Sequence, residues 1–372
     1  MAEFVGGDDA AGGGRADCDL IVVGGGPVGL AAAIGARQRG LSVVVVEPRS
    51  LPLDKACGEG LMPGAMAELA RLGVEVDGHT ITGIAYRQGL GPRFATHDFE
   101  GPSGRGVRRT ALSGALVQRA LSCGVTFVDA KVTALVQDAR GVTVSLGGGS
   151  GIRSRWLFGC DGLHSPVRRM AGLEAAPRRR LVPARRRYGL RRHFSVTPWS
   201  DRVEVFWARR CEVYVTPVGG ATIGVAILGG RGLDFDQVIA SIPALAARLD
   251  GAEPDSTLQG AGPLRQRVRR HGVGRVLLVG DASGYVDALT GEGLRVGLAQ
   301  AAGAVAAIAG AAREPVDVNR AYEHAWSRAS RGANTLTAGL LALAHSPFRR
   351  LVVPISAAFP AVFGAAVERI AR

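Results

Sequence analysis

The amino-acid sequence predicts an α/β fold with an inserted antiparallel β-sheet and a helical C-terminal segment. Two stretches, residues 19–48 and 275–308, each combine a fully apolar strand, a turn of small residues and a helix. Residues 80–99 and 173–264 show the alternation of apolar and polar side chains that is typical of half-buried strands. The chain has 372 residues, 47% of them hydrophobic, which is enough to bury a core divided over two domains.

The first stretch has the spacing of a dinucleotide-binding strand–turn–helix unit. The strand LIVV at 20–23 is followed by Gly24, Gly26 and Gly29 in the order G-x-G-x-x-G. Gly24 permits the tight turn, Gly26 lets the backbone approach a pyrophosphate, and Gly29 lets the helix pack close to the strand. We expect a helix over 28–39 whose N-terminus points at the phosphates.

The second strand of this unit ends in an acid. Residues 43–46 are VVVV, and Glu47 follows, 18 residues after Gly29. A carboxylate at this place can accept hydrogen bonds from both ribose hydroxyls of an adenosine. The strands, the glycines and the acid together predict a Rossmann-type dinucleotide site, but they do not distinguish NAD from FAD.

The stretch at 275–308 provides that distinction. Its apolar strand, predicted over 275–279, ends at Gly280-Asp281, and TGEGLRVGL then opens a long helix rich in Ala and Gly. One Rossmann unit satisfies a nicotinamide dinucleotide, whereas the ribityl chain and large ring of FAD must also be held. Asp281 suits the ribityl or pyrophosphate side, and the helix N-terminus around Gly291–Leu294 can stabilise negative charge on a reduced flavin. The alternative is an Asp-containing helix cap.

Composition argues against several other classes of protein. The net charge is +13, but 43 of the 45 basic residues are arginine, a bias that codon composition explains, and no pattern of stacking aromatics accompanies them. We therefore expect no nucleic-acid partner. The five cysteines are scattered without a C-x-x-C pair, which argues against a disulfide framework and a metal site and favours a reducing compartment.

The two ends of the chain carry separate expectations. Residues 1–17 are rich in glycine and acidic, unlike a signal peptide, and predict a disordered tail. No apolar run reaches the length of a membrane span without glycines or charges, so we expect a cytoplasmic protein that is soluble or at most peripheral to a membrane. Residues 317–372 are helical in pattern and either cap the substrate pocket or lie on a membrane surface and admit lipophilic substrates.

Three motifs resemble those of a known superfamily. They are GGGPVG…E at 24–47, GCDGLHSPVRR at 159–169 and GDASGYVDALTGEGLRVG at 280–297. In this order they resemble FAD-dependent oxidoreductases of the para-hydroxybenzoate hydroxylase and geranylgeranyl reductase superfamily. The resemblance implies a Rossmann-like FAD-binding domain of the GR2 type. With the arguments above, it places the cofactor contacts at Gly24, Gly26, Pro27, Val28, Gly29, Glu47, Pro48, Arg49, Lys55, Cys57, Gly58, Arg109, Val132, Asp161, Gly162, Gly280, Asp281, Gly291, Gly293 and Leu294.

The resemblance also implies a division of the chain. The FAD-binding domain is expected to be discontinuous, at 18–79, 100–172 and 265–316, and the substrate-binding sheet at 80–99 and 173–264, with 317–372 as the helical segment. The superfamily includes flavin-dependent halogenases. A halogenase needs a lysine between flavin and substrate, and usually a Trp-x-Trp-x-x-Pro strand. Lys55 and Lys131 are the only lysines, neither is well placed, and no such Trp pair is present, so we do not expect halogenation.

The segment DKACGEGL at 54–61 resembles the CGxGL stretch of the geranylgeranyl reductase branch. Gly58 and Gly60 let the backbone run close to the isoalloxazine, and Lys55 is expected to meet the pyrophosphate or the flavin. Cys57 is either a redox partner of the flavin or, as is more usual for a lone thiol, a small packing residue. No second cysteine is nearby in the sequence, which argues against a disulfide reductase.

In the relatives, the inserted sheet binds the substrate. Tyr214, Thr216 and Pro217 lie where the family has a Y-x-x-P-like strand that faces the pocket. Tyr188, His193 and Trp207 alternate along neighbouring predicted strands and are expected to face it too. Singly, each is more typical of core or surface, but as a group they indicate a mostly apolar cavity with a few polar groups. The basic run at 177–187 is either a solvated strand edge or a site for an anionic substrate, a carrier protein or the NADPH phosphate.

The leading functional hypothesis is an FAD monooxygenase, driven by NADH or NADPH, of a hydrophobic aromatic or polyketide- or terpenoid-derived small molecule. Oxygen would come from a flavin C4a-hydroperoxide, a chemistry that belongs to the cofactor, so no catalytic side chain is assigned. The main alternative is a reductase of isoprenoid double bonds, favoured by CGEGL and TGEGLRVG. A third is a flavin-binding protein without turnover. We expect a monomer or weak dimer, and a peripheral membrane or carrier-protein contact stays open.

Overall fold

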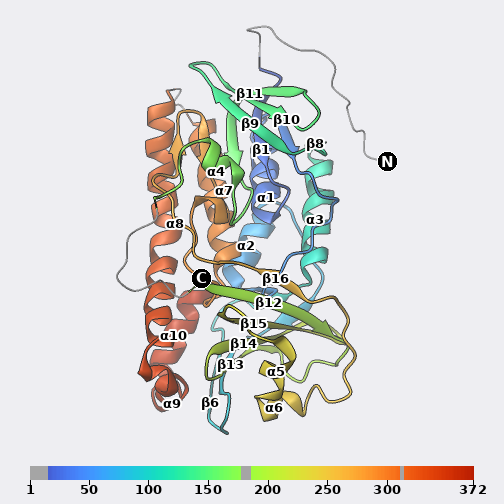
Figure 1. Cartoon of the computed structure of the whole chain (residues 1–372), viewed down its shortest axis with the longest axis vertical. Coiled ribbons are helices and arrows are strands. Elements are labelled where there is room, and N and C mark those ends of the chain that lie inside the picture. Colours follow the sequence, from blue (N-terminus) through green and yellow to red (C-terminus); the bar gives the residue numbers. More distant parts are fainter. Residues whose placement is uncertain (1–15, 177–185, 311–313) are drawn as a thin grey trace.

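The computed structural model describes residues 16–176, 186–310 and 314–372 (Figure 1). In Figure 1 an α/β layer occupies the upper half, a second sheet occupies the lower half, and a long helix runs along one side of both. Residues 1–15 of the predicted tail and residues 177–185 of the basic run lie outside the described residues.

An eight-stranded sheet forms the upper half. Its parallel centre pairs β1 with β2 on one side and with β11 on the other, and β8 and β18 extend it. The remaining strands join antiparallel at the margins. The strands are β1 Cys18–Val23, β2 Val43–Val46, β8 Thr126–Val128, β9 Val132–Gln137, β10 Val142–Leu146, β11 Gly151–Gly159, β17 Gly272–Val273 and β18 Val276–Leu278. The apolar runs of the first motif thus form adjacent parallel strands, as such two-sided burial requires.

Helices cover one face of this sheet. They are α1 Pro27–Arg37, α2 Pro63–Arg71, α3 Arg109–Ser122 and α7 Gly293–Ala309. Side chains of β1, β2 and these helices form one buried core. Close packing of α7 on α1 requires a small residue, because a Cβ at Gly297 would lie 2.5 Å from Val28 Cγ2. On the other face, side chains of the parallel strands form a second buried cluster with the antiparallel strands β9 and β10 of the same sheet and with the short helix α4 Pro166–Met170.

A seven-stranded sheet forms the lower half in the order β16-β12-β15-β14-β13-β5-β6. Its strands are β5 Gly83–Gln88, β6 Phe94–Asp98, β12 Arg187–Phe194, β13 Arg202–Trp207, β14 Cys211–Gly219, β15 Thr222–Gly230 and β16 Gln259–Ala261. Neighbours are antiparallel, as predicted, with one exception: β5 and β13 run parallel. These two strands come from distant parts of the chain, so no hairpin imposes opposite directions on them.

Smaller elements complete this half. Helices α5 Phe235–Ala240 and α6 Pro243–Ala246 pack against the seven-stranded sheet. A three-stranded sheet of β3 Gly60–Leu61, β7 Gly104–Gly106 and β4 His79–Ile81 contacts β14 on one side and α2 on the other. It therefore lies between the two large sheets.

The C-terminal segment is helical, as predicted. It comprises α8 Pro315–Ala344, the 3₁₀ turn η2 Pro347–Leu351, α9 Val352–Ala358 and α10 Pro360–Ala371. Helix α8 contributes Tyr322 to the core of the upper sheet and Leu341 to a second core formed by β5, β13, α9 and α10. In the described part of the chain no single helix is long and apolar enough to cross a membrane, although the bent pair Pro347–Ala358 and Pro360–Ala371 passes that test by length and composition.

Candidate functional site

The three positions of the first motif hold glycine for different structural reasons. Gly24 has φ +111°, and a Cβ there would lie 2.5 Å from the Cys160 carbonyl oxygen. A Cβ at Gly29 would lie 2.0 Å from the Gly24 carbonyl oxygen. Gly26, in contrast, has no heavy atom within 4 Å of its Cβ position. The protein's own backbone explains Gly24 and Gly29, whereas the space at Gly26 is left for something outside the polypeptide, at the N-terminus of α1.

The acid at the end of β2 is buried and held in place. Glu47 Oε2 accepts a hydrogen bond from the Gly25 N–H at 2.8 Å, and Glu47 Oε1 accepts one from Arg49 Nε at 2.8 Å. This hydrogen bond raises the pKa of the Arg49 guanidinium. Pro48 and Arg49 are themselves exposed. The carboxylate therefore has a fixed orientation beside the glycine turn, where an adenosine ribose is expected.

The three sequence motifs meet at one place. The second motif contributes Gly162, whose Cβ position lies 3.6 Å from Lys55 Nζ, and Lys55 in turn pairs with Asp281 Oδ2 of the third motif at 3.4 Å. Gly280 joins the third motif to the first, because a Cβ there would lie 3.1 Å from Val28 Cγ1. Residues that are more than 200 positions apart thus surround the turn at the start of α1.

Two buried polar atoms in this region have no partner among the residues that the structure describes. They are Arg109 Nε, in the first turn of α3, and Asp161 Oδ1. The other oxygen, Asp161 Oδ2, accepts the Val167 N–H at 2.9 Å, and burial raises the pKa of this carboxyl. Buried polar groups are normally hydrogen-bonded, so these two atoms can take a partner from a ligand or an ordered water. Together with the space at Gly26, they fit a bound FAD.

The remaining expected cofactor contacts occupy two positions. Val132 begins β9 and belongs to the same buried cluster as Val46, at the margin of the sheet where an adenine contact is expected. Gly293 and Leu294 begin α7, as the third motif predicts, and Gly291 lies two residues before it. Gly291 is exposed, has φ +71° and has open space at its Cβ position. The helix N-terminus is therefore accessible to the electron-rich edge of a ligand.

A buried polar network, which the sequence analysis did not predict, fixes the 54–60 loop. Glu59 is 3% exposed and has φ +59°, a conformation that is rare for a side chain of this kind. Its Oε2 lies 2.6 Å from His193 Nε2, and its Oε1 accepts the Arg109 N–H at 2.8 Å. The guanidinium of Arg191, also buried, extends the network to Asp54. The only sequence signal for Glu59 was its place within CGEGL.

The hydrogen bonds define the protonation of the ring in this network. Arg191 Nη1 lies 3.1 Å from His193 Nδ1, and a guanidinium can only donate, so Nδ1 must accept. Nε2 then carries the ring hydrogen, and this N–H donates a hydrogen bond to the Glu59 carboxylate. Ser256 Oγ lies 3.0 Å from Nδ1 as well. His193, expected to face a substrate, is thus 2% exposed and engaged at both ring nitrogens.

The other residues expected to face a substrate divide into two groups. Thr216 Oγ1 donates to the Gly58 carbonyl at 2.8 Å, and Tyr214 OH donates to the Leu289 carbonyl at 2.7 Å, so β14 contacts both loops of the candidate site. The carbonyl of Pro217 lies against Gly106 of β7. Trp207 is 7% exposed and instead packs with Tyr86 in the second core, which β5, β13, α9 and α10 form. Tyr188 lies beside the Gly262 backbone, away from this core.

The basic run ends in a buried residue. Arg187 Nε pairs with Asp287 at 3.0 Å and Arg187 Nη2 with Glu212 at 2.5 Å, and Glu212 also pairs with Arg349. The expectation of a solvated edge or an anion site is therefore wrong for Arg187, because two carboxylates already neutralise it. The pair with Asp287 ties the seven-stranded sheet to the loop that precedes α7.

A cavity of about 780 Å³ lies next to the start of α7. Helices α7, α8 and α10 line it, with Glu292 at the N-cap of α7, Arg295 from its first turn, Leu336 from α8 and Pro360 from α10. Glu292 Oε2 is buried and has no partner within the described ranges. None of the six residues expected to face a substrate lines this cavity. It adjoins the helix N-terminus where the flavin ring is expected.

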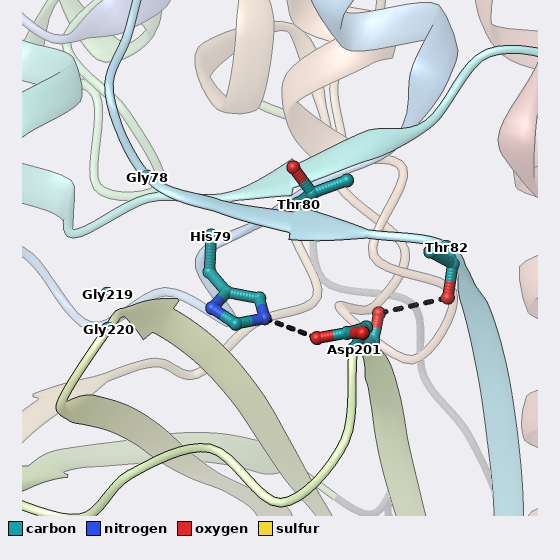
Figure 2. A pocket seen from close by; sticks show the side chains of 7 residues that line it. All are labelled: Gly78, His79, Thr80, Thr82, Asp201, Gly219 and Gly220. Atoms are coloured by element: carbon teal, nitrogen blue, oxygen red, sulfur yellow. Dashed lines mark hydrogen bonds and ion pairs between the residues drawn. The ribbon is translucent and has the colours of Figure 1, made fainter.

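A second pocket, of about 540 Å³, lies at the edge of the small sheet (Figure 2). His79 Nε2 bonds to Asp201 Oδ1 at 2.7 Å, and the Gly219–Gly220 turn forms the opposite wall. Figure 2 shows the Thr80 side chain on the other face of its strand, directed away from His79. This second pocket shares no lining residue with the expected cofactor contacts.

Comparison with known proteins decides the family. A family model described as an FAD binding domain matches residues 17–220, more than half of the chain. This chain belongs to the FAD-binding domain family. It is an FAD-dependent oxidoreductase, which confirms the resemblance drawn from the three motifs.

Curated relatives of this family member include both reductases and monooxygenases. A menaquinone reductase of Mycobacterium tuberculosis is 29% identical over 302 residues, covering 75% of this chain and 74% of that protein. A digeranylgeranylglycerophospholipid reductase 1 of Methanococcoides burtonii is 29% identical over 304 residues, covering 74% and 70%. A rifampicin monooxygenase of Streptomyces venezuelae is 27% identical over 295 residues, covering 76% and 62%.

Solved structures support the predicted fold of this FAD-binding protein. The OxyS anhydrotetracycline hydroxylase of Streptomyces rimosus superposes with a TM-score of 0.70 at 22% identity, covering 95% of this chain and 75% of that one. The α/β fold with an FAD-binding unit, a second sheet and a helical C-terminus is thereby confirmed.

Proposed function

We propose that this FAD-dependent oxidoreductase reduces a carbon–carbon double bond of a lipophilic isoprenoid molecule, with NADH or NADPH as electron donor. Two of the relatives described above are named as reductases, and the similarity extends over 74% and 70% of their lengths, against 62% for the monooxygenase. The order of the two hypotheses is therefore the reverse of the one that the sequence favoured.

The observation that carries the proposal is the fixed CGEGL loop. Glu59 anchors it to β12 through His193, and Thr216 anchors it to β14 through the Gly58 carbonyl. Cys57 lies between these anchors and Lys55, half-buried, and its Sγ accepts the Glu59 N–H at 3.4 Å. The thiol is thus held in place as an acceptor while its own proton stays available.

Bound FAD supplies hydride transfer. Hydride addition to one carbon of a double bond must be accompanied by a proton on the other carbon, and the Cys57 thiol is our candidate donor. The thiolate that forms then takes a proton from solvent. Glu59 and His193 act as positioning residues, because their buried pair determines where the loop lies.

Monooxygenation is the second candidate, supported by the rifampicin monooxygenase relative. One experiment separates the two. The FAD-loaded protein is supplied with NADPH and an isoprenoid quinone, first without oxygen and then under heavy oxygen, and the product is analysed by mass spectrometry. The quinone ring is first reoxidised in air, because its reduction to a quinol also adds two hydrogens. Two hydrogens that stay in the isoprenoid chain support the reductase, whereas incorporation of heavy oxygen overturns it. Cys57→Ser should keep bound FAD and lose at least about tenfold in rate, with Cys123→Ser, distant in the sequence, as matched control.

A further inference from the structure

Large apolar side chains are exposed mainly at one end of the molecule. Of the eleven that are exposed among the described residues, seven come from two short segments, and they are Leu90, Phe94, Phe348, Leu351, Ile355, Phe359 and Val362. We call these seven residues the apolar tip. Strand β6 contacts both α9 and α10, and Figure 1 shows β6 and α9 together at the lower end. Such a concentration marks an interaction surface rather than scattered exposure.

Hydrogen bonds hold the segments of the tip together. The Gly89 N–H donates to the Trp207 carbonyl at 3.2 Å, which places the β5–β6 hairpin beside the β13–β14 turn. Arg349 Nε donates to the Ala208 carbonyl of the same turn at 2.8 Å, which places η2 there too. Segments from three parts of the chain therefore form one surface.

The charge of this surface has a single sign. Arg93, Arg209, Arg210 and Arg350 are exposed on these segments. Residues 88–97, 205–211 and 345–367 contain neither aspartate nor glutamate. An apolar patch with basic residues and no acids is typical of proteins that insert into the headgroup region of a membrane with anionic lipids.

We propose that the apolar tip docks this protein on the surface of a lipid bilayer that contains anionic headgroups. A second copy of the chain is the less suitable occupant, because a symmetric contact would bring like charges together with no acid in the patch to balance them. The segments Pro347–Ala358 and Pro360–Ala371 meet at 102°, so the two helices do not form one straight span. They bury Val353, Phe363 and Val367 against the protein while the tip residues face outward.

The tip adjoins the cavity beside α7. Phe359 and Val362 belong to the tip, and the two residues between them, Pro360 and Ala361, line the cavity. A molecule dissolved in the bilayer would therefore meet the cavity at the edge of the docked surface. This consequence rests on the proposed function, but docking itself does not, so the test below measures binding alone.

Vesicle flotation of the full-length, FAD-loaded protein tests the proposal. Vesicles of phosphatidylcholine alone are compared with vesicles that also contain phosphatidylglycerol. We expect binding to the anionic vesicles, and at least about tenfold weaker binding after raising salt from about 50 to about 300 mM. Phe348→Ser with Phe359→Ser should lower the partition coefficient at least about tenfold. The matched control is Val136→Ser with Val316→Ser, which removes equally exposed apolar side chains outside the tip.

Charge reversal provides an independent measurement. Arg209→Glu with Arg350→Glu should abolish the preference for anionic vesicles, whereas Arg140→Glu in the β9–β10 turn should not. All these positions are exposed, so thermal unfolding should be unchanged in each variant. Wild-type protein that fails to float overturns the proposal, as does equal flotation of tip and control variants. A concentration-dependent dimer that the tip variants abolish, without vesicle binding, would identify a second copy instead.

Discussion

Replacement of Glu59 tests the central structural argument about the candidate site. Glu59 is buried, lies 2.6 Å from His193 Nε2, accepts the Arg109 N–H at 2.8 Å and lies 3.9 Å from Arg191 Nε. Glu59 and Arg191 form a buried charged pair. Removing one member of such a pair costs about 3–5 kcal/mol of unfolding free energy, because the charge of the partner is left uncompensated. Arg191 keeps Asp54 as a second partner, so for Glu59→Ala we expect about 3 kcal/mol, at the lower end of that range.

The backbone at this position provides an internal comparison. With φ +59°, an L side chain costs about 1 kcal/mol relative to glycine. Glu59→Gly removes the same carboxylate as Glu59→Ala but relieves this strain, so it should be less destabilising by about 1 kcal/mol. Glu59→Gln keeps the shape and loses the charge, and we expect about 1.5–3 kcal/mol, as for the loss of a hydrogen bond to a charged group.

Urea unfolding followed by circular dichroism measures these differences, with and without FAD. The matched control is Glu68→Ala, which breaks an ion pair with the exposed Arg71 on the helix surface and should cost less than about 0.5 kcal/mol. If Glu59→Ala unfolds within about 0.5 kcal/mol of the wild type, the network does not hold the loop. If the glycine variant is less stable than the alanine variant, the argument from φ is wrong.

Three further predictions concern the cofactor site, thiol access and pH. Gly26→Ala should leave the unfolding free energy of the apoprotein within about 0.5 kcal/mol of the wild type but weaken FAD binding at least about tenfold. Gly29→Ala, whose Cβ would lie 2.0 Å from a carbonyl oxygen, should instead lower the unfolding free energy by more than about 2 kcal/mol. Fluorescence titration with FAD and urea unfolding distinguish the two variants, and equal effects would contradict the assignment. Alkylation near pH 8 should modify Cys57 and spare Cys18, because burial raises the pKa of the Cys18 thiol to about 12. Bound FAD should slow the reaction at Cys57, and peptide mass spectrometry measures the extent of alkylation at both sites. Burial lowers the pKa of His271 from 6.5, so the unfolded chain takes up a proton before the folded protein does. The free energy of unfolding should therefore fall as the pH drops below 6.5, by at most about 1.4 kcal/mol per pH unit. In urea unfolding His271→Gln should show a smaller fall with pH, and an unchanged slope would refute the prediction.

Local patterns in the sequence predicted the nucleotide-binding unit well. The two strands are marked by their own runs of apolar side chains and the turn by its own glycines, and β2 spans the predicted residues 43–46. The parallel pairing of β5 with β13 and the burial of Arg187 were not predicted. Both depend on partners more than 20 residues away, and a basic side chain carries no local sign that two carboxylates will surround it. The same reason explains why Glu59 and Arg191 were missed.

The seven-stranded sheet is physically part of the candidate cofactor site. His193 holds Glu59 and Thr216 holds Gly58 on one side, and Tyr214 holds the Leu289 carbonyl in the loop before α7 on the other. These hydrogen bonds join β12 and β14 to both loops around the expected flavin ring, so a displacement of the sheet must move the loops or break buried hydrogen bonds. Each broken bond leaves a buried polar group unsatisfied, at about 1–3 kcal/mol. FAD binding should therefore stabilise the two sheets together, and a single cooperative transition in the loaded protein is the expected consequence.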